Sequence, residues 1–251
     1  MPFMSQFFLE MADSIAGQLG RDYGQPIRYP IDLAGLLPFS FDVALVQIAN
    51  LSVVQVNAWF SDKGSQPPSR DHPSRALYGC VVIEQGHAFI FIDSQVTEAE
   101  QRFTLAHEFS HYVVEHYYRR QQVQRELGES FVAILDGKRM LTPEDQLIAM
   151  RRHIPLRPYQ HFMHREADGQ IGERRISEAE QRADLLALEL IAPHRLLLRR
   201  CAAREMFAMQ ANLYHDLVQQ FGLPPLIADS YATQLSGFFN IAPSIRQRLG
   251  G

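Results

Sequence analysis

The sequence predicts an α+β fold in which a small antiparallel or mixed sheet packs on one central helix, with a mostly helical C-terminal half. Two observations lead to this prediction. Two apolar runs, 77–83 and 88–92, precede a helix that begins with a capping signal at Thr97. After residue 176, leucine, alanine and methionine recur at helical spacing. Because 46% of the 251 residues are hydrophobic, the chain can bury a sizeable core, and we expect one domain over 1–251.

The N-terminal quarter of the chain contains four predicted segments. Apolar residues near helical spacing predict an amphipathic helix over 1–20 that packs on the rest of the domain. Prolines then punctuate the chain, and 31–41 is expected to be irregular or a short helix. Residues 43–60 are rich in β-branched side chains and predict a strand. The stretch 61–74 has the composition of an exposed loop, and its His72 is expected to be solvated rather than a ligand.

A β-hairpin is predicted where the two apolar runs meet, because residues 84–87 read Glu-Gln-Gly-His. In the helix that follows, Thr97 can cap the first turn and Glu100, three residues later, completes a capping box. This helix is expected to reach about Tyr118. Its predicted buried side consists of Leu105, Ala106, Phe109 and Val113.

The same helix carries the motif His-Glu-x-x-His at residues 107–111. His107 and His111 lie one turn apart on one face, so their imidazoles can bind one Zn²⁺ at about 2.0–2.1 Å each. Glu108 lies about a quarter turn round and faces the open side of the metal. The probability that a chain of this composition contains the motif by chance is roughly a few per cent. In that case the segment would be a surface helix that happens to carry two histidines. The preceding strand and the capping box favour the metal site.

Residues 101–111, Gln-Arg-Phe-Thr-Leu-Ala-His-Glu-Phe-Ser-His, resemble the active helix of the ImmA/IrrE family of metallopeptidases. The run Phe-Ile-Phe-Ile at 89–92 is similar to the strand that precedes this helix in the family. A later segment, 180–193, resembles the family's second signature, Glu-x-x-Ala-x-x-Phe-Ala-x-x-Leu-Leu-x-Pro, and 217–224 resembles its closing helices. The matching residues of the second signature are Glu180, Ala183, Ala187, Leu190 and Pro193, with Leu186 in place of the aromatic residue and Ile191 in place of the second leucine.

The resemblance covers roughly residues 25–117 and 176–240 and implies a zincin-like metallopeptidase fold. The two signature segments lie further apart than is expected for compact members of the family. Residues 118–175 are therefore predicted to be an insertion between the two helices that carry the metal ligands. Residues 194–251 are predicted to form a C-terminal helical portion.

A catalytic zinc usually has three protein ligands, so a third is expected beside the two histidines. The resemblance, and the spacing Glu-x-x-x-Asp after His-Glu-x-x-His, point to Glu180 as this ligand. Asp184, one turn further along the same face, is expected to accept the N–H of a ligating histidine. The alternatives are that Glu180 completes a helix cap with Ser177, and that Asp184 is an exposed acid. Glu115 is a rival ligand, although three ligands on one straight helix surround a metal poorly.

The predicted insertion contains many arginines, but acidic residues nearly balance them, so a solvated surface is favoured over a nucleic-acid site. Thr142 followed by Pro143 and Glu144 predicts the start of a helix that reaches about Arg152. Four side chains are candidates for stabilising an oxyanion near the metal, with exposed surface as the default. They are His153, Tyr159, His161 and His164.

Three further helices are predicted in the C-terminal portion, over 195–207, 209–221 and 228–239. Their leucine and methionine content indicates that they form core. Cys201 is expected to be a packed small residue, and the alternative is a cysteine that blocks the metal.

For function, the resemblance implies a zinc-dependent endopeptidase with His107, His111 and Glu180 as ligands and Glu108 as the general base. Zn²⁺ is the expected ion, Mn²⁺ is the alternative, and no other cofactor is expected. The resemblance further implies a protein substrate, namely a helix-turn-helix transcriptional repressor cleaved in a stress, DNA-damage, mobile-element or phage response. The substrate is expected to bind extended beside the strand 88–92.

Composition weighs against two other classes of function. The net charge of −4 and a pI near 6.2 give no case for direct nucleic-acid binding. No apolar run reaches the roughly 18–20 residues of a membrane span, and the N-terminus lacks the basic segment of a signal peptide. Only two cysteines are present, which fits a reducing cytosol and a cytoplasmic protein. Two alternatives stay open: a non-catalytic regulatory module with a structural zinc, and a direct DNA-binding regulator.

Overall fold

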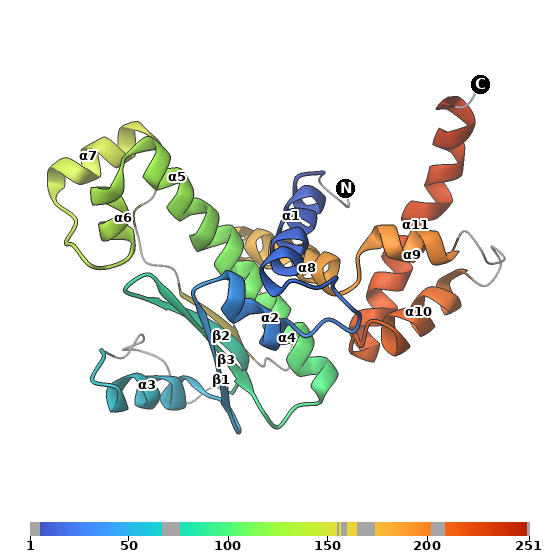
Figure 1. Cartoon of the computed structure of the whole chain (residues 1–251), viewed down its shortest axis with the longest axis horizontal. Coiled ribbons are helices and arrows are strands. Elements are labelled where there is room, and N and C mark those ends of the chain that lie inside the picture. The colour runs from blue at the N-terminus through green and yellow to red at the C-terminus, as the bar shows by residue number, and fades with distance from the viewer. Residues whose placement is uncertain are drawn as a thin grey trace.

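The computed structural model describes residues 6–66, 76–154, 156, 160–164, 174–201 and 209–249. Within them, helices pack on both faces of a four-stranded sheet and extend beyond it, which confirms the predicted α+β class (Figure 1). The strands are β1 (Val43–Ile48), β2 (Leu77–Glu84), β3 (His87–Asp93) and β4 (Gln160–His164). The helices are α1 (Gln6–Tyr23), α2 (Leu33–Ser40), α3 (Val53–Asp62), α4 (Glu98–His111), the π-helical turn η1 (Tyr112–Tyr117), α5 (Tyr118–Glu126), α6 (Glu129–Leu135), α7 (Pro143–Arg151), α8 (Arg174–Ile191), α9 (His194–Cys201), α10 (Met209–Gln219) and α11 (Pro225–Leu249).

The sheet has the strand order β1-β3-β2-β4, so β3 lies in its interior. β3 pairs in parallel with β1 and antiparallel with β2, and β4 pairs antiparallel with the other side of β2. Both edges of β3 are therefore occupied, and the expectation that a substrate strand adds beside 88–92 is wrong. The outer strand β4 belongs to the predicted insertion and was not predicted as a strand.

The predicted hairpin is confirmed by β2 and β3, whose register pairs Glu84 with His87. The two residues between them, Gln85 and Gly86, both have positive φ, of 52° and 89°. A two-residue loop of this conformation has a twist that matches the flanking antiparallel strands. Glycine also lets the turn approach the side chain of Asp136 closely, since an added Cβ at position 86 would lie 2.8 Å from Asp136 Oδ2.

Residues 43–60 form a strand and a helix rather than the single strand that was predicted. β1 ends at Ile48, and α3 begins after Ser52, whose hydroxyl accepts a hydrogen bond from the backbone N–H of Gln55. β-branched residues enter this helix because its apolar side packs on the sheet, and this burial outweighs their weak helix propensity. The resulting cluster consists of Leu51, Val53, Val56, Phe60, Leu77, Cys80, Val82 and Phe91.

The opposite face of the sheet packs on α4, and α4 packs in turn on α8 (Figure 1). The predicted capping box at the start of α4 is confirmed. The Thr97 hydroxyl accepts from the N–H of Glu100, and Glu100 Oε2 accepts from the N–H of Thr97 at 2.9 Å. The core on this face includes Val81, Ile83, Ile90 and Ile92 of the sheet, Ala106 and Phe109 of α4, Val113 of η1, and Leu186, Ala187 and Leu190 of α8.

The sheet approaches α4 closely at Gly79 of β2. A Cβ added there would lie 2.5 Å from Thr104 Cγ2, 3.0 Å from the carbonyl oxygen of Phe91 and 3.2 Å from Glu108 Cγ. Because the two elements are tightly packed, Gly79→Ala is expected to lower the free energy of unfolding by about 1–3 kcal/mol. Chemical denaturation followed by circular dichroism measures the change.

The matched control for this prediction is Gly237→Ala in α11, where no described atom lies within 4 Å of an added Cβ. Alanine is the better helix former, so this variant is expected to gain about 0.5–1 kcal/mol. Equal unfolding midpoints for the two variants would show that the close approach at Gly79 is unimportant for stability.

The helix predicted to end near Tyr118 continues through η1 and α5 to Glu126. α5, α6 and α7 then form a module that projects from the rest of the molecule (Figure 1). Its capping box at Thr142, completed by Asp145, confirms the predicted start of α7. The module has a hydrophobic cluster of its own, formed by Val123, Phe131, Val132, Ile134, Leu135, Ala149, Ile154 and Leu156. The interpretation of this segment as an insertion stays a prediction.

Helices account for the C-terminal portion, as predicted. α9 and α10 begin within one residue of the expected positions, whereas α11 begins three residues earlier than expected and reaches Leu249. α1 and α2 likewise occupy the segments where an amphipathic helix and a short helix were expected. In the part of the chain that the structure describes, no helix is long and apolar enough to cross a membrane.

Candidate metal centre

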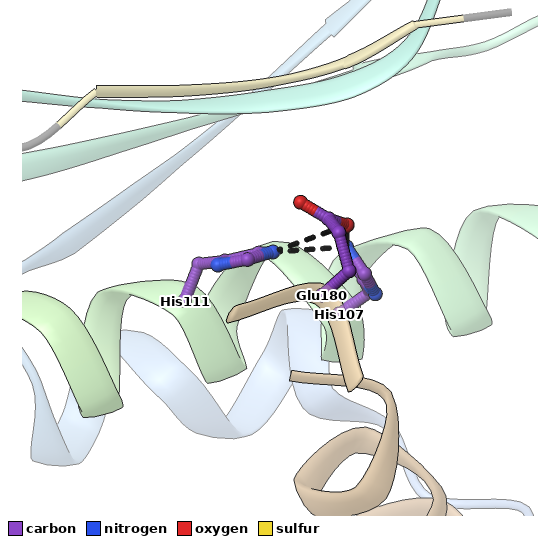
Figure 2. A group of neighbouring side chains, drawn as sticks. All are labelled: His107, His111 and Glu180. Atoms are coloured by element: carbon purple, nitrogen blue, oxygen red, sulfur yellow. Dashed lines mark hydrogen bonds and ion pairs between the residues drawn. The ribbon is translucent and has the colours of Figure 1, made fainter. Parts of the chain in front are cut away.

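Three side chains that the sequence singled out meet between α4 and α8: His107, His111 and Glu180 (Figure 2). The Nε2 atoms of His107 and His111 are 3.1 Å apart. Glu180 Oε2 lies 3.3 Å from His107 Nε2 and 3.6 Å from His111 Nε2. The three donor atoms form a compact triangle in which both imidazoles are buried and the carboxylate side chain is 20% exposed.

The triangle has the size that a zinc ion requires. Bonds of about 2.0–2.1 Å at tetrahedral angles place neighbouring ligand atoms about 3.3–3.4 Å apart. The observed separations of 3.1, 3.3 and 3.6 Å lie around this value. Two imidazole nitrogens and a carboxylate oxygen are also a donor set that suits Zn²⁺. Among the described residues the group has three members, and a tetrahedral ion held by three ligands keeps one position open.

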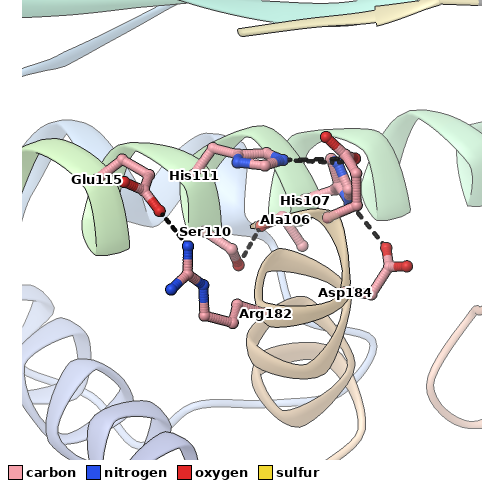
Figure 3. Close-up of polar contacts among 8 residues, drawn as sticks. Ala106, His107, Ser110, His111, Glu115, Arg182 and Asp184 are labelled. Carbon is pink, nitrogen blue, oxygen red and sulfur yellow. Dashed lines mark hydrogen bonds and ion pairs between the residues drawn. The ribbon is translucent and has the colours of Figure 1, made fainter. Parts of the chain in front are cut away.

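Asp184 lies on the side of His107 away from His111 (Figure 3). Its Oδ1 is 2.9 Å from His107 Nδ1. When Nδ1 carries the proton and donates it to Asp184, Nε2 keeps its lone pair and points into the triangle. The sequence did not indicate which histidine Asp184 would contact, and the structure identifies it as His107. The alternative, an acid that only faces solvent, does not describe this contact.

Glu108, the second residue of the motif, lies next to the triangle but is not a member of it. Its side chain is fully buried between α4 and β2, close to Thr104 and to the backbone of Gly79. The negative charge of Glu108 also acts on its neighbour His107, whose pKa it raises. A buried carboxylate beside three metal-binding donors is well placed for proton transfer, and the role of general base stays a prediction.

A salt bridge joins α8 to η1, the continuation of α4 (Figure 3). Arg182 Nη2 donates to Glu115 Oε1 at 2.9 Å, and Arg119 Nη2 donates to Glu115 Oε2 at 3.0 Å. Glu115, the rival ligand, is therefore engaged by two guanidinium groups outside the triangle. Sequence reasoning missed Arg182. The sequence indicates this contact only by charge: Arg182 follows the candidate ligand Glu180 by two residues, and the acid Glu115 follows the histidine motif by four.

The structure excludes helix capping as the role of Glu180. α8 begins at Arg174, so Ser177 and Glu180 both lie inside the helix. A capping box requires Ser177 to precede the first helical turn, where backbone N–H groups lack partners. Glu180 instead points across to α4, where its carboxylate reaches both imidazoles (Figure 2).

The remaining candidates lie elsewhere or outside the described residues. His116 is buried and stacks on Tyr112, with ring centroids 5.7 Å apart. Burial lowers the pKa of His116 to about 4, so its imidazole is neutral. His153 is exposed at the end of α7. Outside the described residues lie His72, Tyr159 and the side chains of His161, His164 and Cys201.

The metal-free site holds a proton on His107. Burial by itself lowers the pKa of this imidazole, but hydrogen bonds to Asp184 and Glu180, and the charge of Glu108, raise it to about 10. A histidine binds metal through a neutral nitrogen, so metal binding at neutral pH must release a proton. Below a pKa of about 10 the deprotonated fraction rises tenfold per pH unit.

The apparent affinity for Zn²⁺ is therefore expected to increase by about tenfold per pH unit between about pH 6 and pH 8. Competition with a chromophoric chelator, corrected for the chelator's own protonation, measures this slope. An affinity that does not change over this range would show that His107 is already neutral in the metal-free protein.

Comparison with known families bears on the segment that carries the motif. The model of the peptidase M78 family, described as the IrrE N-terminal-like domain, matches residues 65–154. The match spans β2, β3 and α4, with both histidines and Glu108, and continues through η1, α5, α6 and α7. It ends before Glu180. No curated protein matches the chain. Residues 65–154 are thus similar to the IrrE N-terminal-like domain, which confirms the resemblance of this segment to the ImmA/IrrE family of metallopeptidases.

Proposed function

We propose that the protein is a zinc-dependent endopeptidase. The observation that carries the proposal is the triangle of donor atoms from His107, His111 and Glu180, whose separations of 3.1–3.6 Å suit one tetrahedral ion. The family match adds support, because it implies a metallopeptidase for the segment with two of these residues. Mn²⁺ is the alternative ion, but Zn²⁺ is favoured because Mn²⁺ prefers oxygen ligands.

In this proposal the chain's own residues position the ligands and move the protons. A bound zinc ion supplies Lewis acidity, which polarises a peptide carbonyl and lowers the pKa of a water molecule from about 15.7 toward 7. Glu108 accepts a proton from the attacking water on its carboxylate and returns it to the nitrogen of the leaving amine. Asp184 accepts the N–H of His107 and so holds the imidazole in the orientation that presents Nε2.

The substrate is a protein, as a peptidase family implies. Within this class we propose a helix-turn-helix transcriptional repressor that is cleaved in response to stress, DNA damage, a mobile element or a phage. The support is the resemblance of both signature segments, 101–111 and 180–193, to ImmA/IrrE proteins. Such a repressor acts in the cytoplasm, where we place the enzyme. Direct DNA binding by this chain is not part of the proposal, because its net charge is −4.

Removal and return of the metal tests the proposed function. The chelated protein is expected to cleave no member of a degenerate peptide library, and about one equivalent of Zn²⁺ per chain is expected to restore cleavage. Mass spectrometry of the products and elemental analysis of the protein measure the two quantities. Undiminished cleavage without metal contradicts the proposal. A tightly bound zinc ion with four protein ligands and no cleavage would instead favour the regulatory module with a structural metal.

A further inference from the structure

The segment around α7 exposes a concentration of apolar side chains. Among the residues that the structure describes, twelve large apolar side chains are exposed, and five of them lie within 140–150. These five are Met140, Leu141, Leu147, Ile148 and Met150, with exposed fractions of 86, 40, 62, 40 and 64%. Single apolar residues are ordinary on a protein surface, whereas a group of them in one place marks an interaction site.

The apolar residues of α7 lie on the side of the helix that faces solvent. Its buried residues are Asp145 and Ala149, one turn apart on the opposite side. At 3.6 residues per turn, Leu147 lies about 160° round the helix from each of them. Pro143 and Met150, four residues before Leu147 and three after it, continue its line along the axis. The helix therefore presents an apolar stripe to solvent.

The position of this stripe is fixed by contacts within the module. Arg139 Nη1 and Nη2 donate to the two carboxylate oxygens of Asp145 at 2.9 and 3.1 Å, and Thr142 caps the first turn. Ala149 belongs to the hydrophobic cluster of the module. Figure 1 shows α7 at the edge of the molecule opposite to α9, α10 and α11. A second molecule can thus reach the stripe without meeting those helices.

Two charged residues beside the stripe indicate what covers it. Glu144 and Arg151 lie on the same side of the stripe, seven residues and about 10 Å apart along the axis. The side chain of neither residue forms an ion pair or hydrogen bond with another residue in the described part of the chain. If a second α7 runs antiparallel about a two-fold axis near Leu147, Glu144 of each copy lies opposite Arg151 of the other. A parallel pair would place like charges opposite each other.

We propose that α7 pairs with α7 of a second copy of this chain, antiparallel and about a two-fold axis. The Leu147 side chains of the two copies meet at the axis, and Met150 of each copy packs on Pro143 of the other. Glu144 and Arg151 form two salt bridges between the copies. One short helix a side buries less than the roughly 1,200 Å² of a standard interface, so the expected Kd is about 10–100 μM. The pairing does not involve the candidate metal centre.

Sedimentation equilibrium of the full chain tests the pairing over concentrations from about 1 to about 300 μM. The wild type is expected to change from monomer to dimer across this range. Leu147→Asp places two carboxylates opposite each other at the axis and is expected to stay monomeric. The matched control is Leu226→Asp, which introduces the same charge at an exposed leucine of α11. This variant is expected to form dimers as the wild type does.

Charge reversal tests the antiparallel orientation. Glu144→Arg and Arg151→Glu each place like charges opposite one another in both salt bridges, and each is expected to raise Kd by about tenfold. The double variant restores opposite charges and is expected to return Kd to within about twofold of the wild type. An equimolar mixture of the two single variants is expected to form heterodimers for the same reason. Thermal unfolding checks that each variant is folded.

Three outcomes would overturn the proposal. The first is a wild type that stays monomeric over the whole range, or a dimer that Leu147→Asp leaves unchanged. The second is a double charge variant that does not recover, because the two helices are then not antiparallel. The third is a monomeric wild type that needs Leu147 to bind vesicles of phosphatidylcholine and phosphatidylserine, which would assign the stripe to a membrane surface. Zinc content and peptide cleavage are measured for the same variants and are expected to be unchanged, so these outcomes leave the proposed function untouched.

Discussion

Replacing Glu108 with glutamine is expected to reduce the turnover of peptide substrates by a factor of about 10²–10⁴. Glutamine has nearly the same shape, so it can occupy the buried position between α4 and β2. Its amide cannot accept the proton of the attacking water at neutral pH. Because Glu108 is not part of the triangle of donor atoms, the variant is expected to bind zinc as the wild type does. Steady-state cleavage rates and elemental analysis measure the two effects.

The control for this experiment is Glu126→Gln, which removes an exposed carboxylate from α5 and is expected to leave turnover unchanged. Thermal unfolding of both variants checks that the buried substitution has not unfolded the protein. A Glu108→Gln variant that keeps full activity would rule out this residue as general base. If Glu108→Gln loses cleavage but still binds the repressor, catalysis is separated from substrate recognition. The regulatory-module alternative does not predict any loss of cleavage, because it has no catalysis.

Replacing a residue that only hydrogen-bonds to a metal ligand typically weakens metal binding by roughly 10–100-fold. Replacing Glu180, a proposed ligand itself, with alanine is expected to weaken zinc binding by more than this. This residue supplies the only oxygen in the described triangle, and two histidines alone are a poor site for zinc. Peptide cleavage is expected to fall in parallel at limiting metal. Competition with a chromophoric chelator measures the affinity.

The matched variant is Glu115→Ala, because this glutamate was the rival ligand and lies nearby on η1. In the structure its carboxylate is engaged by Arg182 and Arg119, so its loss is expected to change zinc affinity far less. A result in which Glu115→Ala loses the metal and Glu180→Ala keeps it would reverse the assignment of the third ligand.

The features that could be predicted from the sequence are those decided by near neighbours in the chain. Thr97 caps α4 with a residue only three positions away, and Gln85 and Gly86 form the turn by their own backbone conformations. The one-turn spacing of His107 and His111 fixes their common face in the same way. Signals of this kind do not depend on the rest of the fold.

The features that could not be predicted depend on contacts between distant segments. β4 becomes a strand because it pairs with the edge of β2. The residues 160–164 alone do not predict this pairing. The β-branched stretch that begins at Val53 becomes helical because one of its sides meets the sheet. Which histidine Asp184 contacts is decided by the way α8 crosses α4, a property of packing rather than spacing.

The placement of the candidate ligands also has a consequence for the folding of the chain. Two of them share α4, whereas Glu180 follows about seventy residues later on α8, beyond a module with its own core. An ion held by all three joins these distant parts of the chain as a reversible cross-link, which the unfolded chain lacks. The folded state is then favoured by RT ln(1 + [metal]/Kd), so resistance to heat and to proteolysis will follow the free zinc concentration around the protein.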